Sequence, residues 1–261
     1  MAGEEEMNTS AFKYYIYLPF AARLVSPDWL GSRFLATLDA LTQIDSNIFP
    51  DWEVGDLPAM KGYPLATARS RIAEIIEHNN VRYDPDDPDT EIGYTAVGET
   101  TIDAKSHRMT LRVGQGNVRL KAGDEMVTPD PAIVTYPLFR ASFLAMNAIW
   151  EQQWGCAKAF RSRGVKVPIG TDGGYRWKRL PMIPTEPTFP VSIFHIPWLA
   201  YLSAPLAAGV KLPPEIQTET TIDGGLLMIA TEERLDPCNP EHLRRARILA
   251  ETMIARTGLS S

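Results

Sequence analysis

The residues of this chain best suited to catalysis or metal binding are its histidines and cysteines, and their spacing fits neither use. The four histidines are His78, His107, His195 and His242. None has the separation found in zinc proteases, and neither Cys156 nor Cys238 has a histidine at ligand spacing. His195 lies in an apolar stretch and reads as a core histidine. We expect His107 to open a strand and His242 to lie on the surface of a helix.

Motifs for nucleophilic or phosphate chemistry are also absent from the sequence. There is no Gly-x-Ser-x-Gly elbow, phosphate-binding loop or dinucleotide-binding fingerprint. Asp172-Gly-Gly and Asp223-Gly-Gly have the residue types of tight turns. We therefore predict a protein that is not an enzyme and needs no cofactor or metal. One alternative stays open, a hydrolase or transferase with its site around His195, Asp172 or the acidic cluster that begins at Asp84.

That acidic cluster reads Asp84-Pro-Asp-Asp-Pro-Asp-Thr-Glu91, and its composition predicts an exposed loop. Its carboxylates could ligate calcium, but the two prolines break the EF-hand spacing and no glycine occupies the sharp turn. An electrostatic patch that steers a basic protein partner is the better functional interpretation. The predicted partner-binding carboxylates are Asp84, Asp86, Asp87, Asp89 and Glu91.

A second candidate contact is the segment from Tyr175 to Arg179, which mixes aromatic and basic residues. Tyr, Trp and Arg dominate interface hot spots, so Tyr175, Arg176 and Trp177 are predicted to contact a partner. The same residue types suit nucleic acid, but a net charge of −6 disfavours phosphate contacts. Packing of Trp177 against the protein body is the alternative.

The composition indicates an ordinary soluble protein, with 44% hydrophobic and 22% charged residues. The acidic N-terminus lacks the pattern of a signal peptide, and no apolar run has the length of a membrane span. We therefore expect a cytoplasmic protein without membrane contact. In that compartment Cys156 and Cys238 are expected to be buried thiols outside disulfide bonds.

Periodicity predicts the elements that must position these residues. Phe12 to Leu18 alternates like a strand. Ser26-Pro-Asp28 has the residues of a helix start, and apolar residues at helical spacing extend the expected helix to about Ile44. Further helices are expected at 65–76 and 139–150, and strands at 92–97, 107–113, 117–121 and 156–161, with a turn at 114–117. The last third is expected to hold a short helix at 197–206, strands at 215–221 and 225–230, and a helix at 240–256.

These elements predict an α+β fold, in which a largely antiparallel sheet packs against several long helices. We expect residues 1–10 to be a flexible N-terminus and 11–261 to form one domain, with a long Gly/Pro-rich loop or arm at 162–190. Glu99-Thr-Thr-Ile-Asp103 recurs at Glu219-Thr-Thr-Ile-Asp223. An internally duplicated strand–turn–strand–helix unit is therefore a further hypothesis.

The order of several short blocks resembles the immunity protein 52 family of bacterial polymorphic toxin systems. These blocks are Leu38-Asp-Ala-Leu-Thr-Gln-Ile-Asp45 followed by Phe49 and Trp52, Gly116-Asn-Val-Arg-Leu120, Trp198-Leu-Ala-Tyr-Leu-Ser203, Asp223-Gly-Gly-Leu-Leu-Met-Ile-Ala230, and Asn239-Pro-Glu-His242. The resemblance leaves out the first ten residues and the segment 162–190.

The resemblance implies an immunity protein that inhibits a cognate toxin by tight stoichiometric binding. Toxins of such systems are commonly DNases of restriction-endonuclease fold delivered by type VI secretion. The acidic net charge agrees with a basic, DNA-gripping partner. A secretion-system adaptor that loads effectors stays open as an alternative, and the oligomeric state is not predicted.

Overall fold

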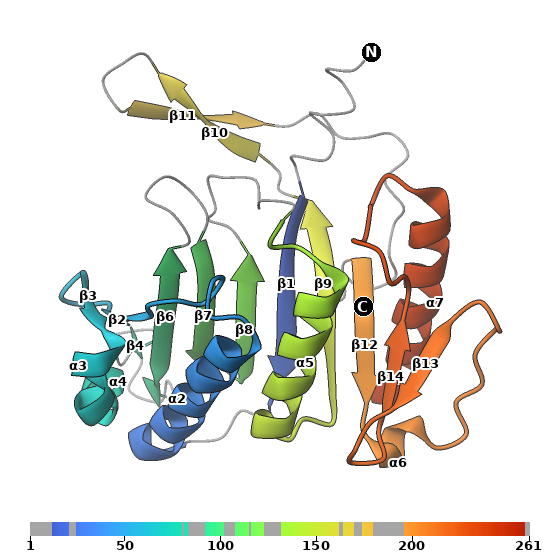
Figure 1. Ribbon diagram of the computed structural model, residues 1–261, viewed down its shortest axis with the longest axis horizontal. Helices are drawn as coiled ribbons and strands as arrows, with labels where there is room; N and C mark the ends of the chain where they lie inside the picture. The colour runs from blue at the N-terminus through green and yellow to red at the C-terminus, as the bar shows by residue number, and fades with distance from the viewer. Residues whose placement is uncertain are drawn as a thin grey trace.

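The computed structural model describes residues 12–20, 25–79, 81–82, 92–101, 108–114, 116–122, 132–161, 164–169, 174–179 and 196–258. A ten-stranded antiparallel sheet runs through the whole molecule in the order β13-β14-β12-β9-β1-β8-β7-β6-β2-β3 (Figure 1). Its strands are β1 (Phe12–Pro19), β2 (Glu53–Asp56), β3 (Lys61–Pro64), β6 (Thr95–Thr101), β7 (Arg108–Gly114), β8 (Asn117–Ala122), β9 (Trp154–Arg161), β12 (Ile196–Leu202), β13 (Gln217–Thr220) and β14 (Leu226–Ile229). The predicted α+β class with a largely antiparallel sheet is therefore confirmed.

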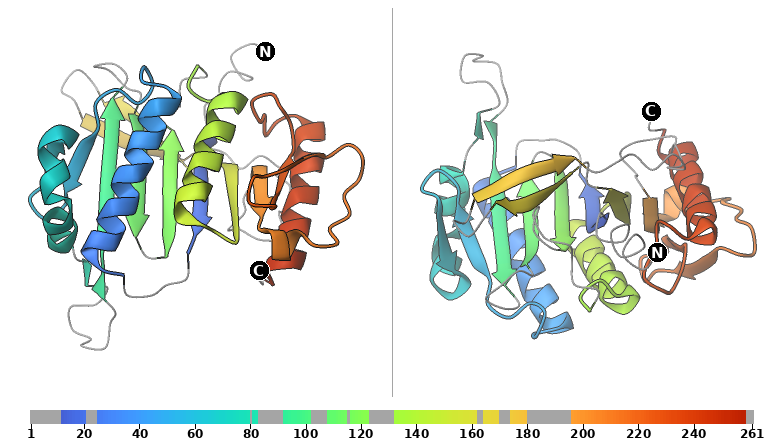
Figure 2. Two further views of the ribbon diagram at one scale, coloured as in Figure 1. Left: turned by 60° about the horizontal axis from the view of Figure 1, so that its bottom comes forward. Right: turned by 90° about the horizontal axis from the view of Figure 1, so that it is seen from above.

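Helices cover the two faces of this sheet in different places. The helices are α2 (Pro27–Ile44), α3 (Leu65–Ala68), α4 (Ile72–His78), α5 (Tyr136–Trp150), α6 (Ala204–Ala207) and α7 (Pro240–Thr257), with a 3₁₀ turn at Arg69–Arg71. Figure 2 shows α2 and α5 on one face and α7 on the other. Two cores result, a large one under α2, α4 and α5 and a smaller one between α7 and β12–β14.

Side chains along the central strand β1 point alternately to the two faces of the sheet. Ile16 and Leu18 are fully buried in the large core, and Ile16 lies between Leu120 of β8 and Ala157 of β9. Tyr15 lies on the opposite face. The predicted strand at 12–18 is confirmed, since side chains two residues apart share one face of a strand.

Side-chain caps start the long helices where the sequence predicted. The Ser26 hydroxyl accepts the backbone N–H of Trp29, and the Asn239 side chain accepts the N–H groups of Glu241 and His242. Proline follows each cap, as its fixed φ favours the first helical position. The helix expected at 65–76 is interrupted, because Arg69–Arg71 form a 3₁₀ turn between α3 and α4.

The prediction of a short helix at 197–206 is wrong. Residues Ile196–Leu202 form β12, every residue of which is buried, and only the four-residue α6 follows. The strand lies between β9 and β14 and has a core on each face. An apolar run with neither periodicity is typical of a strand buried on both faces.

Two predictions about single side chains are also wrong. His242, in the first turn of α7, is buried, and its Nδ1 accepts the backbone N–H of Asp236 from the preceding turn at 3.0 Å. Cys238 is exposed, whereas Cys156 is buried as expected, and neither forms a disulfide. His107 and His195 lie outside the described residues.

Part of the Gly/Pro-rich segment forms a small hairpin. Strands β10 (Gly164–Ile169) and β11 (Gly174–Arg179) pair only with each other, as do β4 (Val81–Arg82) and β5 (Ile92–Gly93). The two copies of the repeated pentapeptide, which begin at Glu99 and Glu219, occupy different positions in the sheet. One begins in β6 inside the sheet, and the other begins in β13 at its edge. The duplication stays a hypothesis.

None of the helices in the described ranges is both long and apolar enough to cross a membrane.

Candidate partner-binding site

Only one of the two predicted contact segments lies within the described residues. Asp84, Asp86, Asp87, Asp89 and Glu91 lie outside the described residues. Tyr175, Arg176 and Trp177 are in β11, where their backbones pair with Pro168, Val167 and Lys166 of β10. Figure 1 draws this hairpin beyond one end of β6, β7 and β8. Its position suits an arm, and the contact roles of these residues stay predictions.

Within the described ranges no three His, Cys, Asp or Glu side chains gather closely enough to hold a metal ion. Surfaces suited to binding are therefore the more informative features, and two stand out. One is a pocket at the end of β1, and the other is the hairpin β2–β3 at the edge of the sheet.

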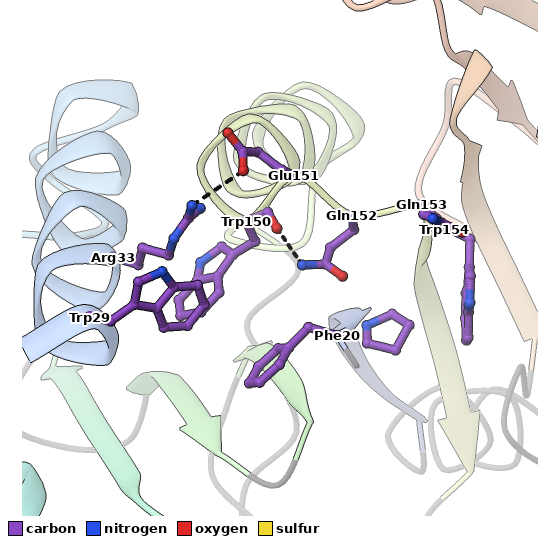
Figure 3. A pocket seen from close by; sticks show the side chains of 9 residues that line it. Phe20, Trp29, Arg33, Trp150, Glu151, Gln152, Gln153 and Trp154 are labelled. Atoms are coloured by element: carbon purple, nitrogen blue, oxygen red, sulfur yellow. Dashed lines mark hydrogen bonds and ion pairs between the residues drawn. The ribbon is translucent and has the colours of Figure 1, made fainter. Parts of the chain in front are cut away.

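The pocket lies where the start of α2, the end of α5 and the ends of β1 and β9 meet (Figure 3). We call it the aromatic pocket, and its volume is about 530 Å³. Its lining residues are Pro19, Phe20, Trp29, Arg33, Trp150, Glu151, Gln152, Gln153 and Trp154.

Stacked rings build one wall of the aromatic pocket. Phe20 stacks on Trp150 at 5.7 Å between centroids and 16° between planes, and Trp29 meets Trp150 edge-on at 5.9 Å. The Trp150 indole N–H donates to the Thr37 hydroxyl at 2.9 Å. Such contacts fix the ring orientations, because offset stacks and edge-on pairs are the favoured aromatic geometries.

Polar groups complete the lining of the aromatic pocket. The Arg33 guanidinium lies 4.7 Å from the centre of the Trp29 ring and donates to the backbone carbonyl of Ile149 and, at 3.2 Å, to the Glu151 carboxylate. The Gln152 amide nitrogen donates to the Trp150 carbonyl, and Figure 3 shows its amide oxygen directed away from Trp150. The pocket therefore offers apolar area and hydrogen bonds, and Glu151 is the one carboxylate among its lining residues. It suits recognition of a side chain of a partner.

The second surface is the turn between β2 and β3, a run of four exposed apolar residues that we call the apolar tip. These residues are Leu57, Pro58, Ala59 and Met60. Met60 is 92% exposed and has a φ of +52°, in the left-handed region. That region costs a residue with a Cβ roughly 1–2 kcal/mol, and hairpin turns usually place Gly or Asn there.

At the base of the same hairpin lies a depression that we call the acidic groove, with a volume of about 920 Å³. Its charged lining residues are Asp39, Asp51, Glu53, Arg69 and Glu99. Four carboxylates and one guanidinium thus line the groove, and the guanidinium of Arg69 is already bound to Asp39 through both terminal nitrogens. The groove therefore has a negative field that favours basic groups.

Sequence reasoning missed both surfaces. Trp29 and Trp150 are far apart in the sequence, and the periodicity at 139–150 predicts only that Trp150 belongs to a helix. The four apolar residues at 57–60 gave no clear signal, because an apolar run suits a core as well as a turn until the pairing of β2 with β3 is known.

The match to known families decides what kind of protein carries these surfaces. A family model described as Immunity protein 52 matches residues 14–260. The chain belongs to the immunity protein 52 family. The predicted resemblance is confirmed, and it extends over nearly the whole chain. The family is one of immunity proteins, so the expected class is confirmed at this level.

Other comparisons are more distant. No curated protein sequence matches this family member significantly. Among solved structures, a T6SS protein of Pseudomonas aeruginosa is similar with 14% sequence identity and a TM-score of 0.45, covering 96% of this chain and 73% of that chain.

The sequence blocks that resemble the immunity protein 52 family have mainly structural roles. Phe49 stacks on Trp52 at 5.7 Å, and the Trp52 indole N–H donates to the Thr42 hydroxyl at 3.1 Å. These contacts hold the chain that leaves α2, and Thr42 and Trp52 also line the acidic groove. The Trp198 indole N–H donates to the Thr231 carbonyl at 2.9 Å and ties β12 to the chain after β14.

Proposed function

We propose that the protein neutralises a cognate bacterial toxin by binding it tightly, one to one and without covalent chemistry. The observation that carries this proposal is the family match over residues 14–260. Surfaces suited to protein contact support it, since the aromatic pocket, the apolar tip and the acidic groove all lie inside the matched range.

The finer proposal is that the toxin is a nuclease, of restriction-endonuclease fold and delivered by type VI secretion. Support comes from charge, because the chain carries a net charge of −6 and its groove at the sheet edge is lined mainly by carboxylates. A protein that grips DNA has a basic binding face, and an acidic inhibitor is steered to that face. Inhibition then takes place in the cytoplasm, where such a toxin acts.

Co-expression with the adjacent toxin gene tests the proposal. Cells that express the toxin alone should lose viability and chromosomal DNA, and cells that also express this chain should keep both. With a catalytically inactive toxin, the two proteins should co-purify. Light scattering should give the mass of a one-to-one complex. Death of cells irrespective of this chain, or separate elution of the two proteins, contradicts the proposal.

The molecular readout separates inhibition from delivery. Purified toxin should degrade plasmid DNA, and the activity should vanish at one molar equivalent of this protein. An adaptor would instead be needed for toxin export and not for survival of the producing cell. If this protein binds the toxin and the toxin still degrades DNA at a large excess of this protein, the adaptor function is favoured.

A further inference from the structure

We propose that the apolar tip of the β2–β3 hairpin (Leu57, Pro58, Ala59 and Met60) is a preformed anchor that inserts into an apolar hollow of the toxin, flanked by basic residues. This inference rests on the proposed function and names the surface through which it operates. It concerns the edge of the sheet, drawn at the left of Figure 1.

Exposure singles out this turn. The large hydrophobic side chains exposed among the described residues are Leu57, Met60 and Ile222, and two of these three lie in the apolar tip. Ile222 stands alone in a polar turn, between Thr221 and Asp223. A single exposed apolar residue is ordinary on a protein surface, whereas a contiguous apolar patch marks an interaction site.

The backbone conformation of Met60 gives a second, independent reason. Its φ of +52° is one that glycine adopts without strain, and its side chain, 92% exposed, makes little contact with the rest of the protein. Folding would be served better by glycine. A strained residue whose side chain faces solvent points to a use outside the fold.

The tip is also held rigidly in place from below. Asn79, at the end of α4, accepts the backbone N–H of Leu57 at 2.7 Å and donates to the Gly55 carbonyl at 2.8 Å. The Asp56 carboxylate accepts the N–H of Ala59 at 3.2 Å and lies 2.9 Å from Nδ1 of His78. Asn79 is 1% exposed and Asp56 8%. A braced turn loses little conformational entropy on binding, as an interface anchor requires.

The surroundings of the tip indicate the chemistry of its partner. The acidic groove lies at the base of the same hairpin, where Glu53 and Pro64 line it. Strands of this length span about 13 Å, so one partner surface reaches both features. An apolar contact beside a negative groove fits a protein with an apolar hollow and basic residues around it, and a nucleic-acid-binding toxin has such residues.

The test measures binding of the inactive toxin from the adjacent gene by titration calorimetry, with thermal unfolding of each variant in parallel. Met60→Gly should raise the dissociation constant at least tenfold, while the melting temperature stays the same or rises. Adding Leu57→Thr should weaken binding further. Ile222→Ser, the matched control at the opposite edge of the sheet, should change binding less than twofold.

A charge series examines the groove separately. Asp51→Asn with Glu53→Gln should slow association at low salt, and the difference should shrink as salt screens the charges. The control Glu232→Gln with Glu233→Gln removes the same charge from exposed residues beyond β14 and should leave the rate unchanged.

The outcomes separate this inference from the proposed function. If the wild type binds the toxin and Met60→Gly with Leu57→Thr binds equally well, the inference is wrong and the proposed function stands. If the wild type does not bind, both are wrong. Sedimentation that shows a dimer lost in Met60→Gly would assign the tip to a second copy of this chain and overturn the toxin as its occupant.

Discussion

The phenolic hydroxyl of Tyr201 donates a hydrogen bond of 2.5 Å to the carboxylate of Asp223, joining β12 to the turn between β13 and β14. The same carboxylate accepts the Thr221 hydroxyl and the backbone N–H of Gly225. Burial and this hydrogen bond raise the pKa of Tyr201 to about 12, so the phenol is a donor at all physiological pH values. Two blocks that identify the family in the sequence thus meet in one structural turn.

Gly225 should be intolerant of any side chain. A Cβ there would lie 2.5 Å from a ring carbon of Tyr201, 2.6 Å from its hydroxyl and 2.8 Å from the Leu202 carbonyl. We expect Gly225→Ala to lower the free energy of unfolding by about 1–3 kcal/mol, measured by urea denaturation. Gly224→Asn is the control, because its φ is +79°, which asparagine tolerates, and a Cβ there would meet the Ala204 Cβ at an ordinary 3.6 Å. An equal loss in both variants would contradict the packing argument.

Asp223 should make stability depend on pH in the acid range. Hydrogen bonds from Thr221 and Tyr201 lower its folded-state pKa below the ordinary value of 3.8. Its contribution is therefore fully present above pH 3.8 and is lost as the pH falls through the folded pKa. Asp223→Asn should be less stable than the wild type at pH 7, and the difference should shrink toward pH 3. A constant difference in urea midpoints would contradict this assignment.

The buried contact between α2 and α5 should be sensitive to removal of one hydroxyl. Thr37 is fully buried and accepts the indole N–H of Trp150 at 2.9 Å. Thr37→Val leaves that buried donor without its acceptor and should lower the free energy of unfolding by about 1–3 kcal/mol. Thr42→Val is the matched control, since Thr42 accepts the Trp52 indole N–H at 3.1 Å but lines the acidic groove, where water can replace it. Thr42→Val should therefore lower the free energy of unfolding by less than Thr37→Val does.

Elements with a clear period or cap were predictable from the sequence. The caps at Ser26 and Asn239 and the stripes on α2, α5 and α7 gave the helices close to their observed bounds. Alternation gave β1, β7 and β8. β12 was mistaken for a helix, because burial on both faces removes alternation. His242 was misplaced because its partner is a backbone N–H in the preceding turn, a contact with no sequence pattern.

The candidate surfaces were less predictable than the fold. The predicted contacts at 84–91 and 175–177 followed from composition, which says nothing of spatial neighbours. The aromatic pocket depends on Trp29 and Trp150, which α2 and α5 bring together only after folding. The apolar tip shows its exposure only once β2 and β3 are paired, since the residues Leu-Pro-Ala-Met would suit a core equally well.

The two cysteines should differ sharply in reactivity. Cys156 is fully buried in the core under α7, and loss of solvation raises its thiol pKa. Cys238 is exposed in the turn before α7. Only the thiolate reacts with disulfide reagents, so one thiol should be titrated in the native protein and a second only after unfolding. Cys238→Ser should abolish the rapid reaction. Rapid reaction of two thiols in the native wild type would mean that the small core opens readily.

Glu151 should be replaceable by glycine without loss of stability. It ends α5 with a φ of +49°, a conformation strained for residues with a Cβ, and its carboxylate lies at the negative end of the helix dipole. What it gains is an ion pair with Arg33, and the Glu151 side chain is 75% exposed, so the pair is worth about 0–1 kcal/mol.

Glu151→Gly should therefore leave the free energy of unfolding unchanged or raise it by up to about 1 kcal/mol, whereas Glu151→Ala should lower it, because alanine loses the ion pair and keeps the strain. Urea denaturation of both variants measures the difference. Equal losses in the two would show that the ion pair outweighs the backbone strain. A gain from glycine would mean that this side chain is kept at the rim of the aromatic pocket for something other than folding, as argued for Met60 at the apolar tip.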